Sequence, residues 1–572
     1  MLFRSIAFST DQTAPATLSS ALRLTGGSFG LAKEQLRFAS QLGRSVSSLS
    51  WSRTTVDGSR QYSRADVRQL SAAADIVMSG STTLALRALH ADMPTALNPG
   101  ALTAAEYAAN RDSAAATNIA RGANKFLLQS QYSARVQHAA PGGTDWSATG
   151  YVLRRFVDNP LATAPRGTTG ATIGTYSTLN RWVTGARFDV AHALCLCADA
   201  TPAAAGTRGT PGTPGTATVP RVSAGLDVQR SFDVRRNWRA TKGVRSTPTD
   251  TLQLNQGESV ISAGPFLTLA WQPTKVLSLS SGARWDQLTF DVFDHFLADN
   301  VNNSGSRRMT AASGHVGASV TASRAFTAYA NYSTAFETPT TTELNARPDG
   351  AGGFNPDLGP QRVRTMEIGA RGTVGPALSY TVSLFRSNAT DAIIQYLETN
   401  GRAYFRNAGR TRNDGAEIGL SARIASWLDG TAAWTAATYR FVTYRVPNGA
   451  VTDTLDGKTL AGVPNRYMRL GARTHWRAAS LDVDHTWSAG MFGDDKNTIR
   501  VADWGKGQLN VRAAWSGAVG AVRVAPFVAV NNLFNEAYVG AVTLNGAFGR
   551  VLEPAPLRNY YVGTELEWRV LR

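Results

Sequence analysis

Cysteine is almost absent from this sequence of 572 residues. The two cysteines, Cys195 and Cys197, are too few and too close together to provide a disulfide framework. With His192 they form an H-x-x-C-x-C spacing, but a metal site needs further ligands and none lies close by in the sequence. We therefore expect no metal here, and the segment is interpreted as an inert strand or loop end.

Long apolar runs are also absent, and charge is sparse. No stretch approaches the roughly 20 apolar residues of a membrane-spanning helix, and the mean hydropathy is −0.18. Charged residues make up 17% of the chain, whereas glycine occurs 53 times. These values exclude a helical membrane protein. They do not exclude a membrane β-barrel, because a spanning strand needs only about 10 residues, half of them apolar.

The charge that is present is predominantly basic. There are 58 Lys and Arg residues against 41 Asp and Glu, a formal net charge of +17. No basic run or recognition helix stands out, so nucleic acid is not an expected partner. Arginines spread along strands and loops fit either solvated strand faces or a lumen that attracts anions, and both interpretations stay open.

Recognisable catalytic and export signals are missing as well. The sequence has no H-E-x-x-H, phosphate-binding loop or Ser/His/Asp order, so we predict that it is not an enzyme. The first twenty residues lack a sustained apolar run, so no signal peptide is predicted in the chain as given.

What the sequence does contain is strict alternation, clearest between residues 404 and 424. The residues from Ala416 to Ile424 alternate between aliphatic side chains and polar or small ones. Successive side chains of a strand point to opposite faces, so this strand has one apolar and one polar face. Two structures fit: a sheet packed on a soluble core, or a membrane barrel that is apolar toward lipid and polar toward its lumen.

The same alternation recurs in residues 468–477, 508–515 and 560–570, with no helical period of comparable length. Strand-like patterns run through the whole chain without a clear linker, which favours one large β-architecture. Residues 200–220, rich in Gly, Thr and Pro, are predicted to be a long loop within this single domain. A soluble enzyme is the least favoured alternative, because no second apolar layer is evident.

Residues 329–372 carry a run of motifs that resembles the barrel of TonB-dependent outer-membrane receptors of the siderophore type. The family pattern is F-x-x-P-x-x-x-E-L, then N-P-x-L-x-P-E, then an E-x-G strand. Gln361 stands where the family usually has Glu. The matching residues are Phe336, Pro339, Glu343, Leu344, Asn355, Pro356, Leu358, Pro360, Glu367 and Gly369.

The resemblance continues through the C-terminal half and covers nearly the whole chain. We interpret its Asn and Gly residues at strand ends as turn-forming rather than ligand-binding. The further motif residues are Asn407, Gly409, Gly415, Glu417, Asn531, Asn532, Phe534 and Asn535.

The resemblance implies an all-β fold: a large antiparallel transmembrane barrel of 22 strands with long extracellular loops. This number suits the length, since 22 strands of about 10 residues use roughly 220 residues. It also implies a Gram-negative outer-membrane location in contact with lipid, a siderophore-type ligand and the TonB–ExbB–ExbD complex as energy partner. We expect a monomer without a cofactor, with iron present only in the ligand.

The N-terminus departs from the family pattern. Residues 6–11 resemble the last strand of the family's plug domain, so we interpret 1–20 as the end of a plug and 21–572 as the barrel. Signal peptide, TonB box and most of the plug are not in the chain as given. The predicted function is therefore uptake of ferric siderophores or similar scarce nutrients, with a passive porin-like pore or a truncated non-functional remnant as alternatives.

Ligand contacts are predicted on the polar faces of two strands. Arg423, Arg469 and Arg473 fall on the side that would line the lumen. They would either attract an anionic chelate or pair with lumen carboxylates such as Glu417, or with a plug. Both possibilities are carried forward.

Overall fold

The computed structural model describes residues 18–140, 142–164, 170–194, 218–245, 252–347, 353–397, 403–448 and 451–570. The cysteine pair, the plug-like residues 6–11 and most of the low-complexity stretch 200–220 lie outside these ranges. The barrel begins at Leu18, so its first strand includes three residues that the sequence analysis assigned to the preceding segment.

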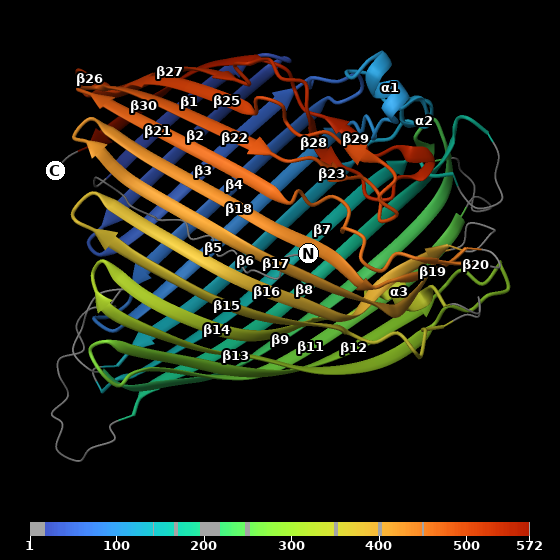
Figure 1. Cartoon of the computed structure of the whole chain (residues 1–572), viewed down its shortest axis with the longest axis horizontal. Helices are drawn as coiled ribbons and strands as arrows, with labels where there is room; N and C mark the ends of the chain where they lie inside the picture. Colours follow the sequence, from blue (N-terminus) through green and yellow to red (C-terminus); the bar gives the residue numbers. More distant parts are fainter. Residues whose placement is uncertain are drawn as a thin grey trace.

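The described chain forms a closed antiparallel β-barrel (Figure 1). The main sheet contains 24 strands, of which β10 (Val244–Arg245), paired with the end of β9, and β26 (Gly517–Val519), paired with the start of β27, are short pieces. The remaining 22 form the wall and confirm the predicted fold class and strand number. They are β1 (Leu18–Gly27), β2 (Leu31–Leu42), β3 (Ser45–Val56), β4 (Ala65–Val77), β5 (Thr82–Ala96), β6 (Phe126–Ala139), β7 (Thr144–Leu161), β8 (Ile173–Ala193), β9 (Thr218–Thr241), β11 (Leu252–Gln272), β12 (Leu277–Asp294), β13 (Gly305–Ser323), β14 (Phe326–Glu337), β15 (Gln361–Val374), β16 (Leu378–Leu397), β17 (Ala403–Ala425), β18 (Leu428–Thr443), β21 (Arg466–Trp476), β22 (Ala479–Ser488), β25 (Gln508–Trp515), β27 (Val522–Asn531) and β30 (Asn559–Val570).

Closure is made by the first and last strands. β1 pairs antiparallel with β30 from Leu18 opposite Val570 to Gly27 opposite Tyr561. This ladder satisfies the backbone groups of both edges, which a sheet in lipid cannot leave unpaired. Arg23 and Glu565, opposite one another in this seam, form an ion pair of 3.0 Å.

Strand β17 shows how the alternation builds the wall. Its aliphatic side chains, including Ile418, Leu420 and Ile424, are exposed on the outer surface. The intervening register, including Asn413 and Gly415, faces the barrel interior, where Asn413 is buried. The sheet therefore has an apolar outer face and a polar inner face, the second of the two structures that the pattern allowed.

The two ends of the barrel differ. At one end most neighbouring strands are joined by turns of two to six residues, such as 426–427 between β17 and β18 and 477–478 between β21 and β22. At the other end most connections are longer; we call it the long-loop end. Its loops hold the remaining elements: α1 (Ala104–Ala109), α2 (Ala116–Ala120), α3 (Thr341–Asn345), β19 (Arg445–Asn448), β20 (Val451–Thr454), β23 (Met491–Phe492), β24 (Arg500–Val501), β28 (Val539–Val542), η2 (Ala547–Gly549) and β29 (Leu552–Pro554).

These helices are short and none forms part of the wall (Figure 1). No helix in the described part of the chain has the length and apolar character needed to cross a membrane.

Candidate functional site at the long-loop end

The loop between β14 and β15, residues 338–360, carries the first group of family motif residues. Its helix α3 begins at a capping box: Thr340 Oγ1 accepts from the Glu343 backbone N–H at 3.3 Å, and the Glu343 carboxylate accepts from the Thr340 N–H at 2.7 Å. Two of the four N–H groups that a helix start leaves unpaired are thereby satisfied. Glu343 is thus a helix-capping residue.

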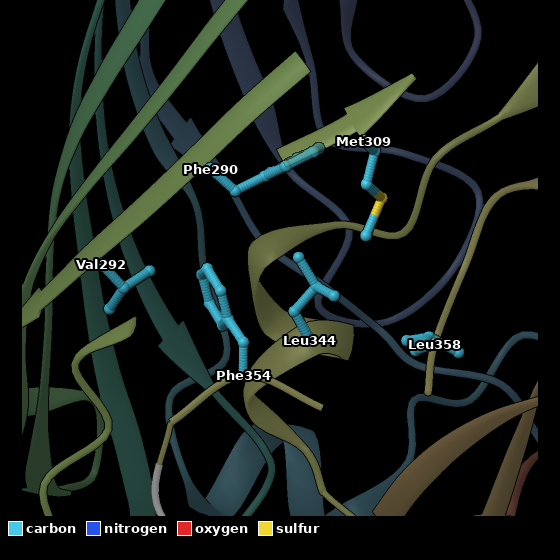
Figure 2. Close-up of a cluster of buried hydrophobic side chains, with 6 residues drawn as sticks. All are labelled: Phe290, Val292, Met309, Leu344, Phe354 and Leu358. Atoms are coloured by element: carbon cyan, nitrogen blue, oxygen red, sulfur yellow. The ribbon is translucent and has the colours of Figure 1, made fainter. Parts of the chain in front are cut away.

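An apolar cluster holds this loop against the wall (Figure 2). Leu344 of α3 is fully buried, and Leu358 from the end of the loop is buried beside it. Their partners come from β12, β13 and the loop, namely Phe290, Val292, Met309 and Phe354. Such packing inside an otherwise polar barrel fixes the position of the loop at the mouth of the lumen.

Polar contacts add to this attachment. Thr341 Oγ1 donates to the buried carboxylate of Glu258 on β11, and Arg235 Nη1 on β9 donates to Thr342 Oγ1 at 2.6 Å. Arg235 also lies 3.6 Å from the Glu258 carboxylate. A buried carboxylate without partners is energetically costly. These contacts therefore stabilise the Glu258 carboxylate and attach α3 to the wall.

Two asparagines of the family motifs tie the end of the same loop to β17. Asn355 Nδ2 donates to the Phe405 carbonyl at 3.1 Å, and its Oδ1 accepts from Asp357 N–H at 3.0 Å. Asn407 makes a reciprocal pair with Gly359: Oδ1 accepts from its N–H at 2.6 Å, and Nδ2 donates to its carbonyl at 2.8 Å. Their role in this structure is to hold loops together.

The opposite part of the mouth is built from the loops β5–β6 and β27–β30. Arg550 Nη2 lies 2.6 Å from Glu106 Oε1 of α1, and Leu102 bridges to Leu552. An apolar cluster of Val501, Val539, Val551 and Leu552, with Tyr107 at its edge, joins these two loops to the β22–β25 loop, which supplies Val501. The loops therefore pack as a small tertiary structure of their own.

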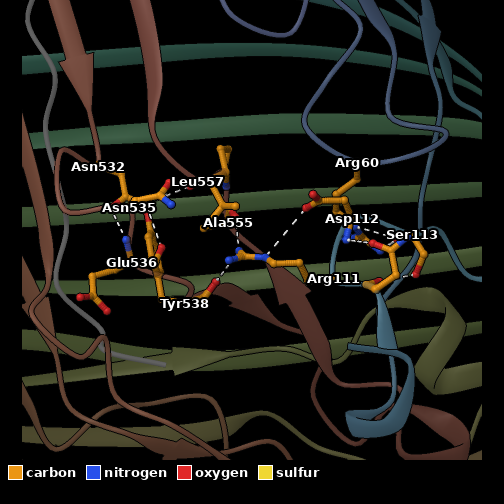
Figure 3. A network of polar contacts seen from close by, with 12 residues as sticks. Arg60, Arg111, Asp112, Ser113, Asn532, Asn535, Glu536, Tyr538, Ala555 and Leu557 are labelled. Carbon is orange, nitrogen blue, oxygen red and sulfur yellow. Dashed lines mark hydrogen bonds and ion pairs between the residues drawn. The ribbon is translucent and has the colours of Figure 1, made fainter. Parts of the chain in front are cut away.

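A network of arginines and backbone carbonyls extends this packing (Figure 3). Arg60 donates to Gly100 O at 2.7 Å and Ser113 O at 2.9 Å, and burial lowers the pKa of its guanidinium. Arg111 donates to the carbonyls of Ala555 and Tyr538. Burial also disfavours the charged form of Tyr538 and therefore raises the pKa of its phenol. Loop carbonyls that water would otherwise satisfy are thereby paired inside the protein.

The Asn531–Asn535 motif forms the start of the β27–β30 loop. Asn532 is fully buried; its Oδ1 accepts from Glu536 N–H at 3.0 Å and its Nδ2 donates to Glu536 O at 2.9 Å. Asn535 Oδ1 accepts from Arg558 N–H at 3.0 Å. Asn531 ends β27 opposite Asn559, while Phe534 is exposed. The amides of Asn532 and Asn535 thus bond to backbone groups of their own loop.

Two motif glycines lie under aromatic rings on the inner wall. A Cβ at Gly369 would lie 2.5 Å from the Tyr329 ring, and one at Gly415 would lie 2.5 Å from the Phe385 ring. Tyr329 Oη also donates to Glu367 at 2.9 Å, which places a third motif residue in the same contact. These glycines are required by close packing.

The remaining motif residues lie near the same loops. Pro339 is fully buried beside α3, whereas Phe336 lies at the end of β14 and pairs with Arg362 of β15. Pro356 and Pro360 belong to the β14–β15 loop, Gly409 packs against Ile394, and Glu417 lies on the inward register of β17.

The three predicted ligand residues line the interior, and each lies beside an aspartate. Arg423 is 3.5 Å from Asp429, and Arg469 is 3.0 Å from Asp484. Arg473 pairs with Asp482. Arg423 and Arg473 lie near the short-turn end, not beneath the α3 loop. The structure therefore brings each arginine to a carboxylate other than Glu417, without gathering the three into one cluster.

One residue at the long-loop end was not selected from sequence. Phe548, in η2, is 95% exposed and has a φ of 59°, a conformation that non-glycine residues rarely adopt. We therefore add Phe548 to the candidate ligand contacts. Its only sequence signal is the Gly-Ala-Phe-Gly context, which resembles an ordinary turn.

Within the residues that the structure describes, no group of three or more His, Cys, Asp or Glu side chains is placed to hold a metal ion. His192, the described member of the H-x-x-C-x-C spacing, pairs with Thr144 at 2.8 Å.

A closed antiparallel barrel of 22 strands, apolar outside, polar inside and covered at one end by folded loops, defines an outer-membrane receptor barrel. Residues 29–533 match the family model "TonB dependent receptor-like, beta-barrel", and the chain belongs to this family. Membership places the protein in the Gram-negative outer membrane and confirms the predictions of a receptor barrel and of a protein that is not an enzyme.

Solved structures share this fold at low sequence identity. The unliganded ferric citrate transporter FecA aligns with a TM-score of 0.77 at 15% identity, covering 96% of this chain and 78% of that one. The ferric yersiniabactin uptake receptor FyuA from Yersinia pestis gives 0.73 at 13%, covering 97% and 81%. The copper transporter OprC gives 0.72 at 16%, covering 98% and 81%.

Proposed function

We propose that this barrel takes up a metal chelate, in the first place a ferric siderophore, from the long-loop end, in a process energised by TonB. Family membership supports a receptor for scarce nutrients, and two of the named structural neighbours carry ferric chelates. A copper transporter is also among the neighbours, so copper is the alternative candidate for the metal in the chelate.

The observation that carries the proposal is the arginine content of the inner wall. Arg181 pairs with Asp233 at 2.5 Å on the neighbouring strand, Arg284 with Asp286 at 2.8 Å, and Arg469 with Asp484 at 3.0 Å. An arginine beside an aspartate can exchange its partner for a ligand carboxylate, because both present the same planar pair of oxygens. A wall of this kind suits an anionic, multidentate chelate.

The exposed ring of Phe548 and the folded loops around α1 and α3 supply the outer part of the proposed binding surface. The loops are held by buried apolar clusters, so the surface is largely formed before a ligand arrives. This arrangement favours recognition of a bulky ligand at the mouth over free diffusion through it.

The test is a binding panel on the purified protein in detergent, read by tryptophan fluorescence. Ferric citrate, a ferric catecholate, a ferric hydroxamate and a cupric chelate are titrated alongside the metal-free ligands. Saturable binding of one ferric chelate supports the proposal, and preference for the cupric chelate reassigns the metal. Large steady conductance in planar bilayers without saturable binding supports the alternative of a passive pore, and failure to become β-rich and heat-modifiable supports a non-functional remnant.

A further inference from the structure

The outer face of β15 to β18 carries a row of arginines at its long-loop end. In the strand register, Arg364 lies opposite Asn388, Asn388 opposite Arg412, and Arg412 opposite Arg440. These four residues therefore lie side by side on four successive strands. We call them the arginine row. Arg364, Arg412 and Arg440 are exposed and share the outward register of their strands.

The row lies just beyond the apolar outer face. The next outward row toward the short-turn end consists of Met366, Arg386 and Asp414. The row after that consists of Ile368, Leu384 and Ala416. On β17 the outward register is apolar from residue 416 to residue 424, a stretch of nine residues. That is about the length a tilted strand needs to cross the hydrocarbon layer, so the row falls at headgroup level.

The positive charge of this region is only partly compensated. Asp414 is the one carboxylate in the arginine row and the outward row next to it, and it already pairs with Arg386 at 2.5 Å and Arg412 at 2.8 Å. Arg364 and Arg440 make no ion pair within the described part of the chain. Arg412 and Arg440 stand directly opposite each other, and like charges in that position repel.

The corresponding position on β2 to β5 provides an internal comparison. There Glu34, Arg53, Arg68 and Asp92 form a row across four strands, directly beyond the row of Leu36, Trp51, Leu70 and His90. Arg53 pairs with Asp66 at 2.9 Å, and Arg68 pairs with Asp66 at 3.1 Å and Asp92 at 3.5 Å. This row contains two acidic and two basic residues, whereas the arginine row contains three arginines and no carboxylate.

We propose that the arginine row is a docking surface for phosphorylated lipid headgroups of the leaflet at the long-loop end. Guanidinium groups bind phosphate through paired N–H donors, and basic residues at headgroup level attract anionic lipid. A phosphate bound between Arg412 and Arg440 would relieve their repulsion, while the acyl chains would lie along Ile368 and Leu384. The inference requires only that the barrel sits in the membrane and is independent of what its lumen carries.

The test compares the wild-type protein with R364Q/R440Q, which removes two arginines that have no ion pair to lose. R53Q/R68Q is the matched control, because it removes the same charge at the same height. Each purified protein, shown to be heat-modifiable, is titrated in zwitterionic detergent with diphosphorylated lipid A and with its dephosphorylated counterpart. Inorganic phosphate is added as competitor in a parallel titration.

We expect the phosphorylated lipid to bind the wild-type protein in a salt-sensitive manner and R364Q/R440Q about 30-fold more weakly, at about 1 kcal/mol per arginine. R53Q/R68Q should stay within about twofold of wild type. Equal binding of the two lipids, unchanged binding by R364Q/R440Q, or an equal loss in the control would overturn the proposal. Full displacement by millimolar phosphate would replace the lipid surface with a free-anion site.

Discussion

Arg550 and Glu106 join two loops that lie 444 residues apart in the sequence, with the Arg550 Nη2 nitrogen 2.6 Å from the Glu106 Oε1 oxygen. Glu106 also accepts from the Thr103 N–H at 2.9 Å, so one carboxylate caps α1 and anchors the β27–β30 loop. The ion pair requires the ionised carboxylate, and a hydrogen bond to a charged acceptor is stronger than one to a neutral acceptor, so the packing of the mouth depends on pH.

Acidification is therefore expected to loosen these loops. Burial alone would raise the pKa of Glu106, but hydrogen bonds from Thr103 and Arg550 outweigh it and the pKa is lowered in the folded protein. A group with a depressed folded pKa stabilises the fold above its unfolded pKa, roughly 4.3, and that contribution is lost as pH falls through the folded value. The protection factors of residues 104–109, which compare the intrinsic exchange rate with the measured rate at each pH, should fall between pH 7 and pH 3. E106Q should show the lowered protection already at pH 7. E553Q, which removes a hydrogen bond with Thr543 and an electrostatic interaction with Arg60 but no contact of α1, should not. Equal protection of α1 at both pH values in the wild type would contradict this.

Leu344→Ala is expected to detach the α3 loop without unfolding the barrel. The side chain is fully buried in the cluster of Figure 2, and such truncations cost about 2–5 kcal/mol. Because Leu344 itself lies in α3 and not in a wall strand, heat-modifiability should be unchanged while protease cleavage within residues 338–360 accelerates. Leu297→Ala, an exposed leucine at the same end, is the control. A similar cleavage rate in both variants would show that the cluster does not hold the loop.

Gly415→Val is expected to impair barrel assembly, whereas Gly419→Val is not. Both glycines lie on the inward register of β17, but a Cβ at Gly415 meets the Phe385 ring at 2.5 Å and one at Gly419 meets nothing within 4 Å. The yield of heat-modifiable protein after refolding measures the difference. Equal yields would mean that Phe385 moves aside without cost.

The triple variant R423Q/R469Q/R473Q is expected to lower the affinity for the ligand with little change in the stability of the barrel. The three arginines are more than half exposed, and exposed ion pairs contribute about 0–1 kcal/mol each, so thermal unfolding should shift little. Affinity for the ferric chelate found in the binding panel should fall about tenfold or more, since three positive charges leave the lumen. R53Q, on the outer face, should leave affinity unchanged. Unaltered affinity of the triple variant would mean that the three arginines form ion pairs within the wall and do not contribute to ligand binding.

Phe548→Ala is expected to weaken chelate binding while leaving the fold intact, because a ring that is 95% exposed contributes little packing. Loss of ring stacking or apolar contact should raise the dissociation constant about 5- to 10-fold. Leu42→Ala, exposed on the outer face near the short-turn end, is the control. Identical titration curves for Phe548→Ala and wild type would remove Phe548 from the binding surface.

The wall could be predicted from sequence because its rule is local. The alternation from Ala416 to Ile424 alone assigned the two faces of β17, and the ordered motifs indicated the family and the strand number. The alternation is weaker in β4, where small alanines replace large aliphatics, and sequence reasoning did not separate this strand. A period-two pattern is detectable only where the two faces differ in size or polarity.

The partners across strands could not be predicted, because they depend on register. The arginines at 423, 469 and 473 were assigned to the lumen, but pairing with Asp429, Asp484 and Asp482 follows from strand pairing that spacing does not reveal. The arginine row could not be recognised from the sequence for a related reason. Arg410, Arg412 and Asp414 continue the outward register of β17 beyond the lipid, and this switch from apolar to charged residues resembles the start of a loop.

The most direct test of the central claim is uptake of a radiolabelled ferric chelate by native cells, with and without functional TonB. The proposed receptor predicts saturable uptake that requires both this protein and TonB and stops when the proton gradient is dissipated. Uptake that rises linearly with concentration and persists without TonB would contradict energised transport and identify the barrel as a passive pore.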